Sequence, residues 1–565
     1  MPLPPSGNVP WPPPLLEIPH ADMDMWRAWY SGDPGHLAAV YGGVAAYTGN
    51  PVARSFFDVD RRRAVGTGEL RMFWGQDAAP GQTAAKLHVP VAGDIAEMSA
   101  NLLWSEVPQV TVDTDSTDLA KTTTAQIGRY LDDRGHATMR EAAEMTAGLS
   151  NVFLRVVWDV TLRPRPWIDV LPAEAVVPEW RWGLLAAATV WRELAPLTDG
   201  GEVWRLLEYH MPGAIEYGVY RGARDKLGIR MELTDHPDSA EYAARTDMLG
   251  RQATGVARLL ITHLPNVLPN RMWDGIPGTA PLGRSDYAGI EPMMDALDEA
   301  WTSWMRDLRL GKARVVVPQS MLDTDGPGTG GSFDLDKELL VSLNLLGNES
   351  MKDSITELQF AIRVDDHERT CKALRSQILS SAGYSSQSFG DEGAVAVTAT
   401  EVAAREKLSL STRGLKLLYQ RPALLEVLTT MMQADVRHCG AKAVDPAAEL
   451  TASWPQAVQP DQEATARTLQ LLDSAGAIST FFKVKMREPS WDDEEVWQEV
   501  RRIRDDANAD SGNAPAGDPF NTGGGDPHAG ADPEDPGADD AVQAGADEGL
   551  DGEVMVGGGS PELAA

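Results

Sequence analysis

The chain of 565 residues has little cysteine and no long apolar run. Its two cysteines, Cys371 and Cys439, cannot supply a framework of disulfides or a cysteine zinc site, and they suit a reducing compartment. No stretch approaches the roughly 18 apolar residues of a membrane helix. The proline-rich N-terminus lacks the charged and apolar regions of a signal peptide. We therefore expect no membrane contact and a place in the producing cell, or in a particle assembled there.

Positive charge is also scarce. The chain holds 50 Lys and Arg against 83 Asp and Glu, a net charge of −33. Fifteen of the acidic residues follow from Asp505 onward, where Lys and Arg are absent, which leaves −18 over the first 504 residues. A protein that grips nucleic acid tightly presents a basic surface. The composition therefore argues against tight DNA binding over a large area and leaves weak or repulsive contact open.

Sequence signatures of enzymes and ligand sites are missing as well. No GxxxxGKS or GxxxxGKT motif is present, so a phosphate-binding P-loop is excluded. The glycines at 326, 328, 330 and 331 precede no helix start, which favours a flexible loop. Ten scattered His residues suggest no Ser/His/Asp arrangement. We expect no enzymatic activity and no cofactor.

Two sets of residues could hold a metal ion. Asp113, Asp115 and Asp118 offer oxygen ligands for Ca²⁺, but a capped turn before a helix explains them better. His367 and Glu368 lie near Cys371 without a second His or Cys pair. We therefore expect no metal site.

Helical periodicity dominates what is present. Prolines make residues 1–24 an extended arm, after which Asp22 or Asp24 could cap a helix. The clearest helix spans 285–310, with Ser285 as its cap or with a start at Glu291 because of Pro292. Its expected packing face comprises Ile290, Met294, Leu297, Trp301, Trp304 and Leu308. Further helices are expected over 90–104, 119–131, 138–149, 363–382 and 400–438 (broken at Pro422), and as short helices within 461–505.

Short β-type runs interrupt the helices. They lie at 109–112, 153–158, 167–170, 189–193, 204–209 and 215–220, and a further pair lies at 313–317 and 357–360. The fold class is therefore α+β and predominantly helical. Residues 507–565 are rich in Gly, Asp, Ala and Pro, so they cannot offset their ordering entropy and should form a disordered acidic tail.

Four passages in a fixed order resemble the portal proteins of tailed bacteriophages of the siphophage type. They are Arg284–Ile290 with Asp295-Ala-Leu-Asp298, the strand at 312–318, DHERTCKALRSQILSSAGYSSQSFG at 366–390, and Gly476–Ser479 with Trp491–Arg504. The resemblance spans most of residues 20–505. Each motif is weak by itself, and their order carries the similarity.

The resemblance implies a portal fold of wing, stem, clip and crown. The implied parts are a wing at 25–284 and 399–455, stem helices at 285–310 and 363–382, a clip at 311–362, a tunnel loop at 383–398 and a crown at 456–506. It also implies a ring of twelve copies at one capsid vertex of a virion, the head-to-tail connector, assembled in the host cytoplasm. Double-stranded DNA would be packaged through this ring and later ejected.

The same resemblance implies the partners. These are further copies of the chain, the large terminase subunit, the major capsid or scaffold protein, and head-completion proteins. Two alternatives remain open at this point. One is another virion component, such as a head–tail adaptor or minor capsid protein. The other is a multidomain hydrolase or nuclease.

Candidate DNA-facing residues follow from the implied tunnel. Arg369, Lys372 and Arg375 near the loop could make a few transient phosphate contacts, although solvated side chains or inter-subunit ion pairs explain them at least as well. The expected tunnel-loop residues are Tyr384, Ser385, Ser386, Gln387, Ser388, Phe389 and Gly390. Their hydroxyls could touch DNA, and an ordinary surface loop is the competing interpretation.

Overall fold

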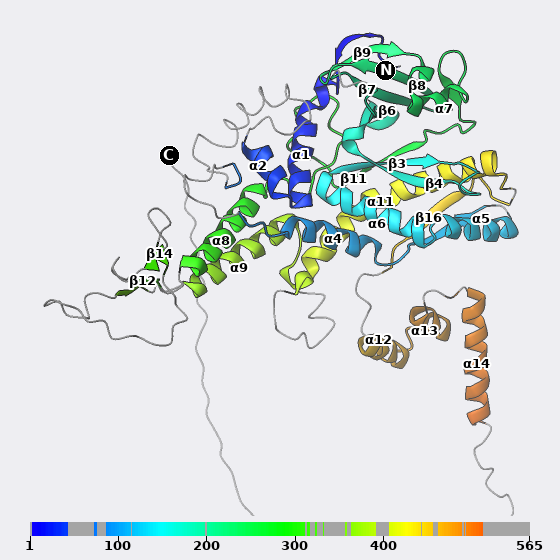
Figure 1. Ribbon diagram of the computed structural model, residues 1–565. Helices are drawn as coiled ribbons and strands as arrows, with labels where there is room; N and C mark the ends of the chain where they lie inside the picture. The colour runs from blue at the N-terminus through cyan, green and yellow to red at the C-terminus, as the bar shows by residue number, and fades with distance from the viewer. Residues whose placement is uncertain are drawn as a thin grey trace, which may run out of the picture. The chain divides into compact units, whose positions relative to one another are not determined.

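The computed structural model divides the chain into two compact units, Met1–Thr465 and Ala466–Ala565. The structure describes residues 3–42, 73–75, 86–114, 116–197, 201–310, 363–390, 406–441, 443–455, 462–488, 491 and 493–511, and the backbone of four short strands within 314–358. The fold is mixed α/β (Figure 1).

The first unit contains an antiparallel sheet of seven strands in the order β1-β9-β8-β7-β6-β5, with β10 pairing with β8 beside β9. The strands are β1 Gly7–Pro10, β5 Val176–Arg181, β6 Leu184–Leu194, β7 Val203–Met211, β8 Ala214–Gly222, β9 Lys226–Met231 and β10 Arg251–Ala253. The runs expected at 189–193, 204–209 and 215–220 are confirmed within β6, β7 and β8. Strand β7 is buried along seven consecutive residues because both of its faces are covered. Leu207 and Tyr209 pack with Leu3 and Trp11 on one face, and Trp204 and Leu206 pack with Tyr242 of helix α7 (Pro237–Ala243) on the other.

The proline-rich start of the chain is part of this sheet, so the arm expected over 1–24 is extended at β1 but helical from Glu17 onward. Strand β1 pairs with β9. Leu3 and Trp11, on either side of β1, are buried against side chains of β6, β7, β8 and β9. Helix α1 (Glu17–Ser31) begins six or eight residues earlier than a cap at Asp22 or Asp24 implied, and neither residue caps it. Pro19 is tolerated because the first N–H groups of a helix have no helical acceptor. Helix α2 (Pro34–Gly42) follows.

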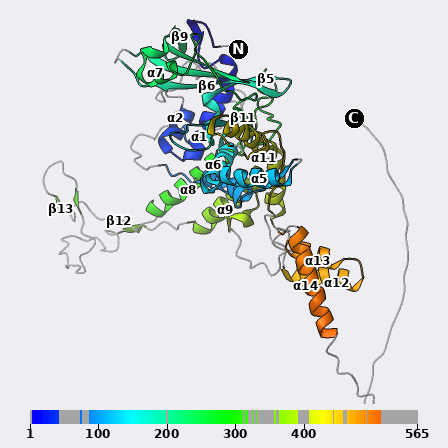
Figure 2. The ribbon, with the colours of Figure 1, turned by 90° about the vertical axis from the view of Figure 1, so that its right-hand side faces the viewer.

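A three-stranded antiparallel sheet and a bundle of helices form the rest of the core (Figure 2). Its strands are β11 Ile261–Pro265, β3 Asn151–Val157 and β4 Trp167–Pro172, and a separate ladder joins β2 Gln109–Asp113 to β16 Glu449–Ser453. The helices are α4 Val91–Trp104, α5 Thr117–Tyr130, α6 Asp133–Leu149 and α11 Lys407–Ala434. Buried Ala, Ser and Gly residues on α4 and α6 let these two helices pack closely.

Side-chain caps explain where α5 and α6 begin. The Ser116 hydroxyl accepts a hydrogen bond from the Leu119 amide at 3.4 Å, and the Asp132 carboxylate accepts one from the Gly135 amide at 3.0 Å. Such caps satisfy N–H groups that the first helical turn leaves unpaired. A capped turn does precede α5 as expected, but its capping side chain is Ser116 and none of the acidic residues considered for it, and α6 begins before the expected Thr138.

Helix α11 passes through Pro422 without a break, contrary to expectation. A proline in a helix removes the hydrogen bond to the carbonyl four residues earlier. That carbonyl belongs to Leu418, whose side chain is 65% exposed, so water can hydrate the region. A π-helical turn, Asp435–Cys439, continues the helix after Ala434.

Helix α12 (Gln462–Ser474) crosses the boundary into the second unit, which also contains α13 Thr480–Arg487 and α14 Asp493–Ser511. Val484 and Val496 are buried between α13 and α14, and the rings of Phe481 and Trp497 lie 4.9 Å apart. The short helices expected within 461–505 are confirmed. Helix α14 continues to Ser511, past the expected start of the tail at 507, and residues 512–565 lie outside the described part of the chain.

Candidate functional site: the helix pair α8 and α9

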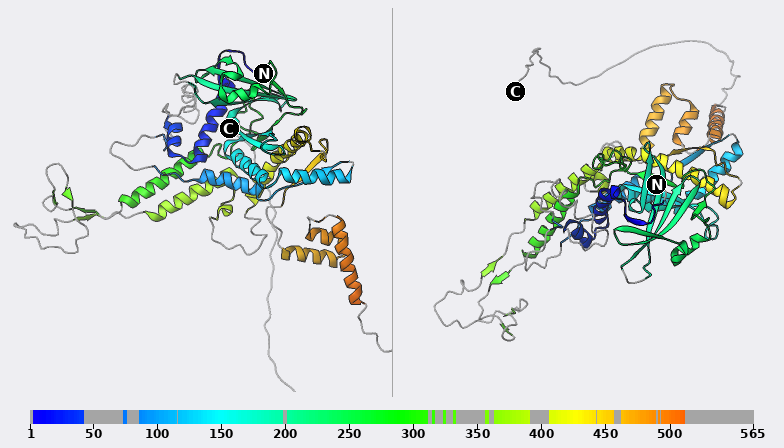
Figure 3. Two further views of the ribbon diagram at one scale, coloured as in Figure 1. Left: turned by 45° about the vertical axis from the view of Figure 1, so that its right-hand side comes forward. Right: turned by 90° about the horizontal axis from the view of Figure 1, so that it is seen from above.

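Helices α8 (Glu291–Leu310) and α9 (Val364–Ala382) lie side by side, as both views in Figure 3 show. Between them the chain forms two antiparallel ladders. Strand β12 (Arg314–Val316) pairs with β15 (Thr356–Leu358), and β13 (Asp323–Thr324) pairs with β14 (Gly331–Ser332). The expected strand at 313–317 and return strand at 357–360 are thus confirmed with slightly different ends. Other residues of 311–362 lie outside the described ranges.

Helix α8 begins at Glu291 and not at Ser285. Ser285 is buried, and its hydroxyl donates to the Gly148 carbonyl at 2.6 Å and accepts from the Tyr287 amide at 3.0 Å. The Glu291 carboxylate accepts from the Trp26 indole at 2.9 Å and the Gly289 amide at 2.7 Å. Ser285 therefore fixes the approach to the helix, while Pro292 lies in the first turn, where a missing N–H costs nothing.

Three buried carboxylates, Glu291, Asp295 and Asp298, recur along α8 at steps of four and three residues and so share one face. Asp295 accepts hydrogen bonds from the amides of Phe73 at 2.6 Å and Trp74 at 3.1 Å. Burial raises its pKa from 3.8 to about 6, and these two hydrogen bonds oppose the shift.

Asp298 is the most heavily bonded of the three. It accepts from the Trp74 indole at 2.9 Å and from the Val89 amide at 2.8 Å, and it lies 2.8 Å from Nδ1 of His88. The carboxylates on α8 thus bind segments that lie more than 200 residues away in the sequence. Sequence reasoning treated Asp295 and Asp298 only as part of a motif. Acidic residues in phase with an apolar helix face are the signal that could have revealed them.

An apolar and aromatic seam joins the two helices. Ile290, Met294 and Leu297 are buried in the same core cluster as Cys371, Ile378 and Leu379. Trp301 and Trp304 pack against this cluster with ring centroids 5.0 Å apart. Leu308 differs from expectation, because it lies in the last turn beyond the core and is 38% exposed.

Polar contacts close the seam near the strand ladders. The His367 ring stacks on Trp304, and its Nε2 lies 2.9 Å from Oδ2 of Asp307. Arg363 donates to the same carboxylate at 3.3 Å. The hydrogen bond with His367 holds the pKa of Asp307 below its usual range, and that with Arg363 adds to the effect. Within the described ranges, no three or more His, Cys, Asp or Glu side chains gather as metal ligands would.

The end of α9 is fixed by a buried polar cluster of Asp286, Tyr384 and Lys416. The Tyr384 hydroxyl donates to Oδ2 of Asp286 at 2.8 Å, and Nζ of Lys416 lies 2.5 Å from the same oxygen. Lys416 also donates to the Ser99 hydroxyl at 2.7 Å. Burial lowers the pKa of Lys416, and the Asp286 carboxylate opposes this shift. Sequence reasoning missed this cluster because its members are far apart in the chain. They come from α4, the segment just before α8, the turn after α9, and α11.

Helix α11 also holds the turn after α9. The Thr412 hydroxyl donates to the Gly383 carbonyl at 2.5 Å, and the Ser385 amide donates to the Ser409 hydroxyl at 2.9 Å. Tyr384 is buried and bonded to Asp286, so its hydroxyl cannot reach DNA in this arrangement, and that part of the expectation is corrected. Residues from Ser386 to Phe389 form a half-buried 3-10 turn and Gly390 is exposed, whereas 391–398 lie outside the described ranges.

The three candidate DNA contacts lie on α9. Arg369 and Lys372 are exposed and Arg375 is half-buried. Three exposed carboxylates, Asp365, Asp366 and Glu368, occupy the preceding turns of the same helix. These three basic residues recur at steps of three and so share one side of α9, with the carboxylates one turn away, an arrangement that gives weak phosphate contact.

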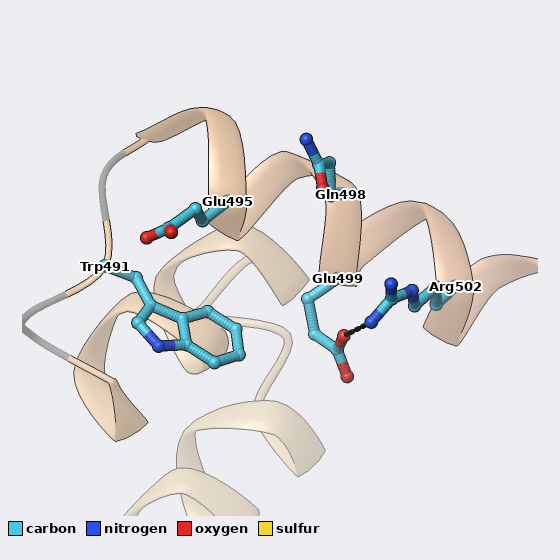
Figure 4. A pocket seen from close by; sticks show the side chains of 5 residues that line it. All are labelled: Trp491, Glu495, Gln498, Glu499 and Arg502. Atoms are coloured by element: carbon cyan, nitrogen blue, oxygen red, sulfur yellow. Dashed lines mark hydrogen bonds and ion pairs between the residues drawn. The ribbon is translucent and has the colours of Figure 1, made fainter.

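A small pocket of about 240 Å³ lies in the second unit (Figure 4). Trp491, Glu495, Gln498, Glu499 and Arg502 line it, and Arg502 donates to Glu499 at 3.4 Å. Four of these residues belong to one helix, α14. The pocket lacks the enclosing apolar walls of a small-molecule site.

No protein-family model matches the chain, and no curated protein matches it. Three of the solved chains to which this chain is similar come from gene transfer agent (GTA) particles. One, from the neck of an empty GTA particle computed with C6 symmetry, is 14% identical, with 71% of this chain and 91% of that chain covered and a TM-score of 0.37. Another, from the neck of a native GTA particle computed with C12 symmetry, is 15% identical, with 70% and 89% covered and a TM-score of 0.33.

The third, from the virion of a native GTA particle, is 17% identical, with 76% and 98% covered and a TM-score of 0.32. Scores this low establish no function. In the described part of the chain, no helix combines the length and apolar character that a bilayer crossing requires.

Proposed function

We propose that this chain is the portal protein of a tailed-phage-like particle, a non-catalytic subunit of a ring through which double-stranded DNA is packaged and later leaves. One observation carries the proposal. Two long adjacent helices, α8 and α9, enclose a segment with strand ladders, in the order that the sequence resemblance implies for stem and clip. In such a subunit the helix pair lines a channel and presents the strands at one mouth.

The construction of the helix pair supports this role. Glu291, Asp295 and Asp298 bind the α8 base to distant segments, and Asp286 with Lys416 binds the α9 end to α11. A base fixed by buried, charge-assisted hydrogen bonds resists displacement when load is applied to the far end of the pair. A DNA-conducting subunit needs that resistance at its strand-bearing tip, where we place the contacts with the large terminase subunit and the head-completion proteins.

The charge of the chain supports passage of DNA rather than binding. DNA carries about one negative charge per 1.7 Å of its axis, and each basic contact to it strengthens binding. The net charge of −33 and the small number of exposed basic residues on α9, Arg369 and Lys372, fit a wall that DNA slides along. The ring places the protein in the virion, beside the capsid or scaffold protein.

Electron microscopy of the purified full chain tests the proposal. We expect closed rings of about a dozen copies with a central hole, as the sequence resemblance implies. A chain that stays monomeric at high concentration and cleaves DNA in the presence of Mg²⁺ would exclude a portal.

The DNA contacts have a separate test. The double variant Arg369→Ala with Lys372→Ala should assemble rings as the unmodified chain does and reduce the DNA packaged per particle, measured by quantitative PCR of nuclease-protected DNA. Lys226→Ala, an exposed basic residue on the distant sheet, is the matched control. Unchanged packaging in the double variant would exclude Arg369 and Lys372 as DNA contacts.

A further inference from the structure

The seven-stranded sheet packs against the three-stranded sheet β11-β3-β4, which lies beneath it in Figure 1. Val190 of β6 is buried in one cluster with Phe153 of β3. Glu208 of β7 lies directly opposite Val190, and His210 follows two residues later on the same strand. Opposite residues of adjacent strands, and alternate residues along a strand, share a face of the sheet. The side chains of Glu208 and His210 therefore point into the contact between the two sheets.

A charged link crosses this contact. Arg155 of β3 donates to Oε2 of Glu208 at 2.8 Å, and it also donates to Oδ2 of Asp169 on β4 at 2.7 Å. Burial opposes ionisation of Glu208, but its hydrogen bond with His210 and the charge of Arg155 hold its pKa below the usual range. Glu208 is therefore a carboxylate that binds a guanidinium of the facing sheet, and such charge-assisted hydrogen bonds are strong ones.

The imidazole of His210 fits this contact as a neutral ring. The residue is 2% exposed, and its Nε2 lies 3.4 Å from the same Oε2 atom that accepts from Arg155. Its Nδ1 is buried and has no hydrogen-bond partner among the described residues. Burial lowers the pKa of His210 further than its hydrogen bond with Glu208 raises it, and the charge of Arg155 lowers it too. A proton on the ring would leave a buried N–H group without an acceptor and add a second positive charge beside Arg155.

Other charged or titratable groups surround the contact, but they offer this proton no compensation. They come from β4, β6, β8, β11, α7 and the turn after α7, and they are Asp169, Arg192, Tyr217, His263, Tyr242 and Arg245. Asp169 is the acidic member of this set, and it already binds Arg155. A proton on His210 would therefore meet further positive charge and no unused carboxylate within the set.

We infer that protonation of His210 is a switch that opens the contact between the two sheets in acid. The proton would weaken the link from Arg155 to Glu208, because two cations would then share one carboxylate oxygen. A ring that is neutral while the sheets are packed and free to ionise once they separate takes up its proton only in the separated state. The packed state is therefore fully favoured above the ordinary histidine pKa of about 6.5 and loses favour as pH falls below it. This switch lies within a single chain and goes beyond the proposed ring.

Thiol labelling of the full chain at pH 7 and pH 5.5 tests the switch. In a Cys439→Ser background, which leaves only the buried Cys371, Val190→Cys places a thiol inside the contact. Its rate of reaction with 4,4′-dithiodipyridine is divided by that of free cysteine at the same pH. Opening should be favoured about tenfold for each pH unit below about 6.5, so the corrected rate should rise about tenfold at pH 5.5. Adding His210→Gln, which cannot ionise but can donate to Glu208, should abolish the rise.

Two controls separate the switch from general unfolding. Ala187→Cys places the thiol on the other face of β6, in the cluster with Leu3, and its corrected rate should not change with pH. His136→Gln, on α6 and away from the contact, should leave the rise at Val190→Cys intact.

The absence of a rise at pH 5.5, an equal rise at Ala187→Cys, or a rise that persists with His210→Gln would overturn the inference. His210→Leu is a second side chain that cannot ionise, and it replaces His210→Gln in the comparison if that variant does not fold. Ring formation is measured separately by electron microscopy, so a failed switch leaves the proposed portal role standing.

Discussion

Lys416 and Asp286 form a deeply buried ion pair in the first unit, with side chains 3% and 6% exposed. Asp286 also accepts from Tyr384 and from the Asn266 amide at 2.8 Å. Removing one partner of such a pair leaves an uncompensated charge in an apolar surrounding, which costs more than the pair itself contributes.

Lys416→Met should therefore destabilise the first unit by roughly 3–5 kcal/mol, the usual cost of leaving one buried charge unpaired. Chemical denaturation followed by tryptophan fluorescence measures this loss. The exposed Lys372→Met is the matched control and should stay within about 0.5 kcal/mol of the unmodified chain. The double variant Lys416→Met with Asp286→Asn should recover part of the stability, and failure to recover any would show that the charge is not the cause.

Asp295 should make the free energy of unfolding depend on pH, and the direction of this dependence follows from its raised pKa. Its pKa in the folded chain is about 6, above the ordinary value of 3.8, so folding favours the protonated form. The stabilising contribution is complete below pH 3.8 and is lost as pH rises through 6. Between pH 7 and pH 5 the unmodified chain should gain about 1 kcal/mol relative to Asp295→Asn.

Thermal melting of both chains at pH 5, 6 and 7 measures this difference. Asn cannot ionise, so the melting temperature of the unmodified chain should rise relative to that of Asp295→Asn as pH falls from 7 to 5. The exposed Asp274→Asn should show no such trend. A difference that is constant across pH would contradict the raised pKa of Asp295.

At the scale of elements, the end of α9 depends on one glycine. Gly383 has φ of 92°, and a Cβ at this position would lie 2.7 Å from the Thr412 hydroxyl that donates to its carbonyl. The left-handed conformation and the close approach both require glycine. This residue turns the chain from the helix pair toward α11.

Gly383→Ala should lower the free energy of unfolding by about 1–3 kcal/mol, because alanine is strained at positive φ and displaces Thr412. Hydrogen exchange should show reduced protection of the last turn of α9. Gly414→Ala is the matched control, since Gly414 lies on the exposed face of α11 with open space around it and should be unchanged or stabilised by up to about 1 kcal/mol. Equal effects at both positions would contradict this account.

Most helices of the first unit, and about half of its strands, were predictable from the spacing of apolar residues. The expected run at 109–112 is β2, and the expected helix at 90–104 is α4. The strands that were missed are β1, β5, β9, β10, β11, β13, β14 and β16, and β5 and β9 show why. Both carry residues of low strand preference, Pro178 and Glu179 in β5 and Gly228 in β9, and their pairing with β6 and β8 compensates for them.

At the scale of the whole molecule, the C-terminal residues differ in amino-acid composition from the rest of the chain. Residues 512–565 contain few large apolar side chains and no Lys or Arg. Removing them should leave every thermal transition within about 1 °C, since no apolar area is predicted to be lost. Calorimetry of the shortened chain measures this.

A longer deletion from 493 onward is the contrasting variant. It also removes Val496, which is buried in the second unit, and Trp497 beside Phe481, so it should abolish the transition of that unit. A large change on removing 512–565 alone would show that this segment packs on the rest.

The sequence by itself determined the α and β character of most segments, the net negative charge and the order of two long helices around strands. These follow from periodicity and charge, which are local properties. Only the tertiary structure decided that Asp286 binds Lys416, that Glu291, Asp295 and Asp298 fix the base of α8, and that the first residues join a sheet edge. These contacts join residues far apart in the chain, and their free energy depends on burial, which no local pattern specifies.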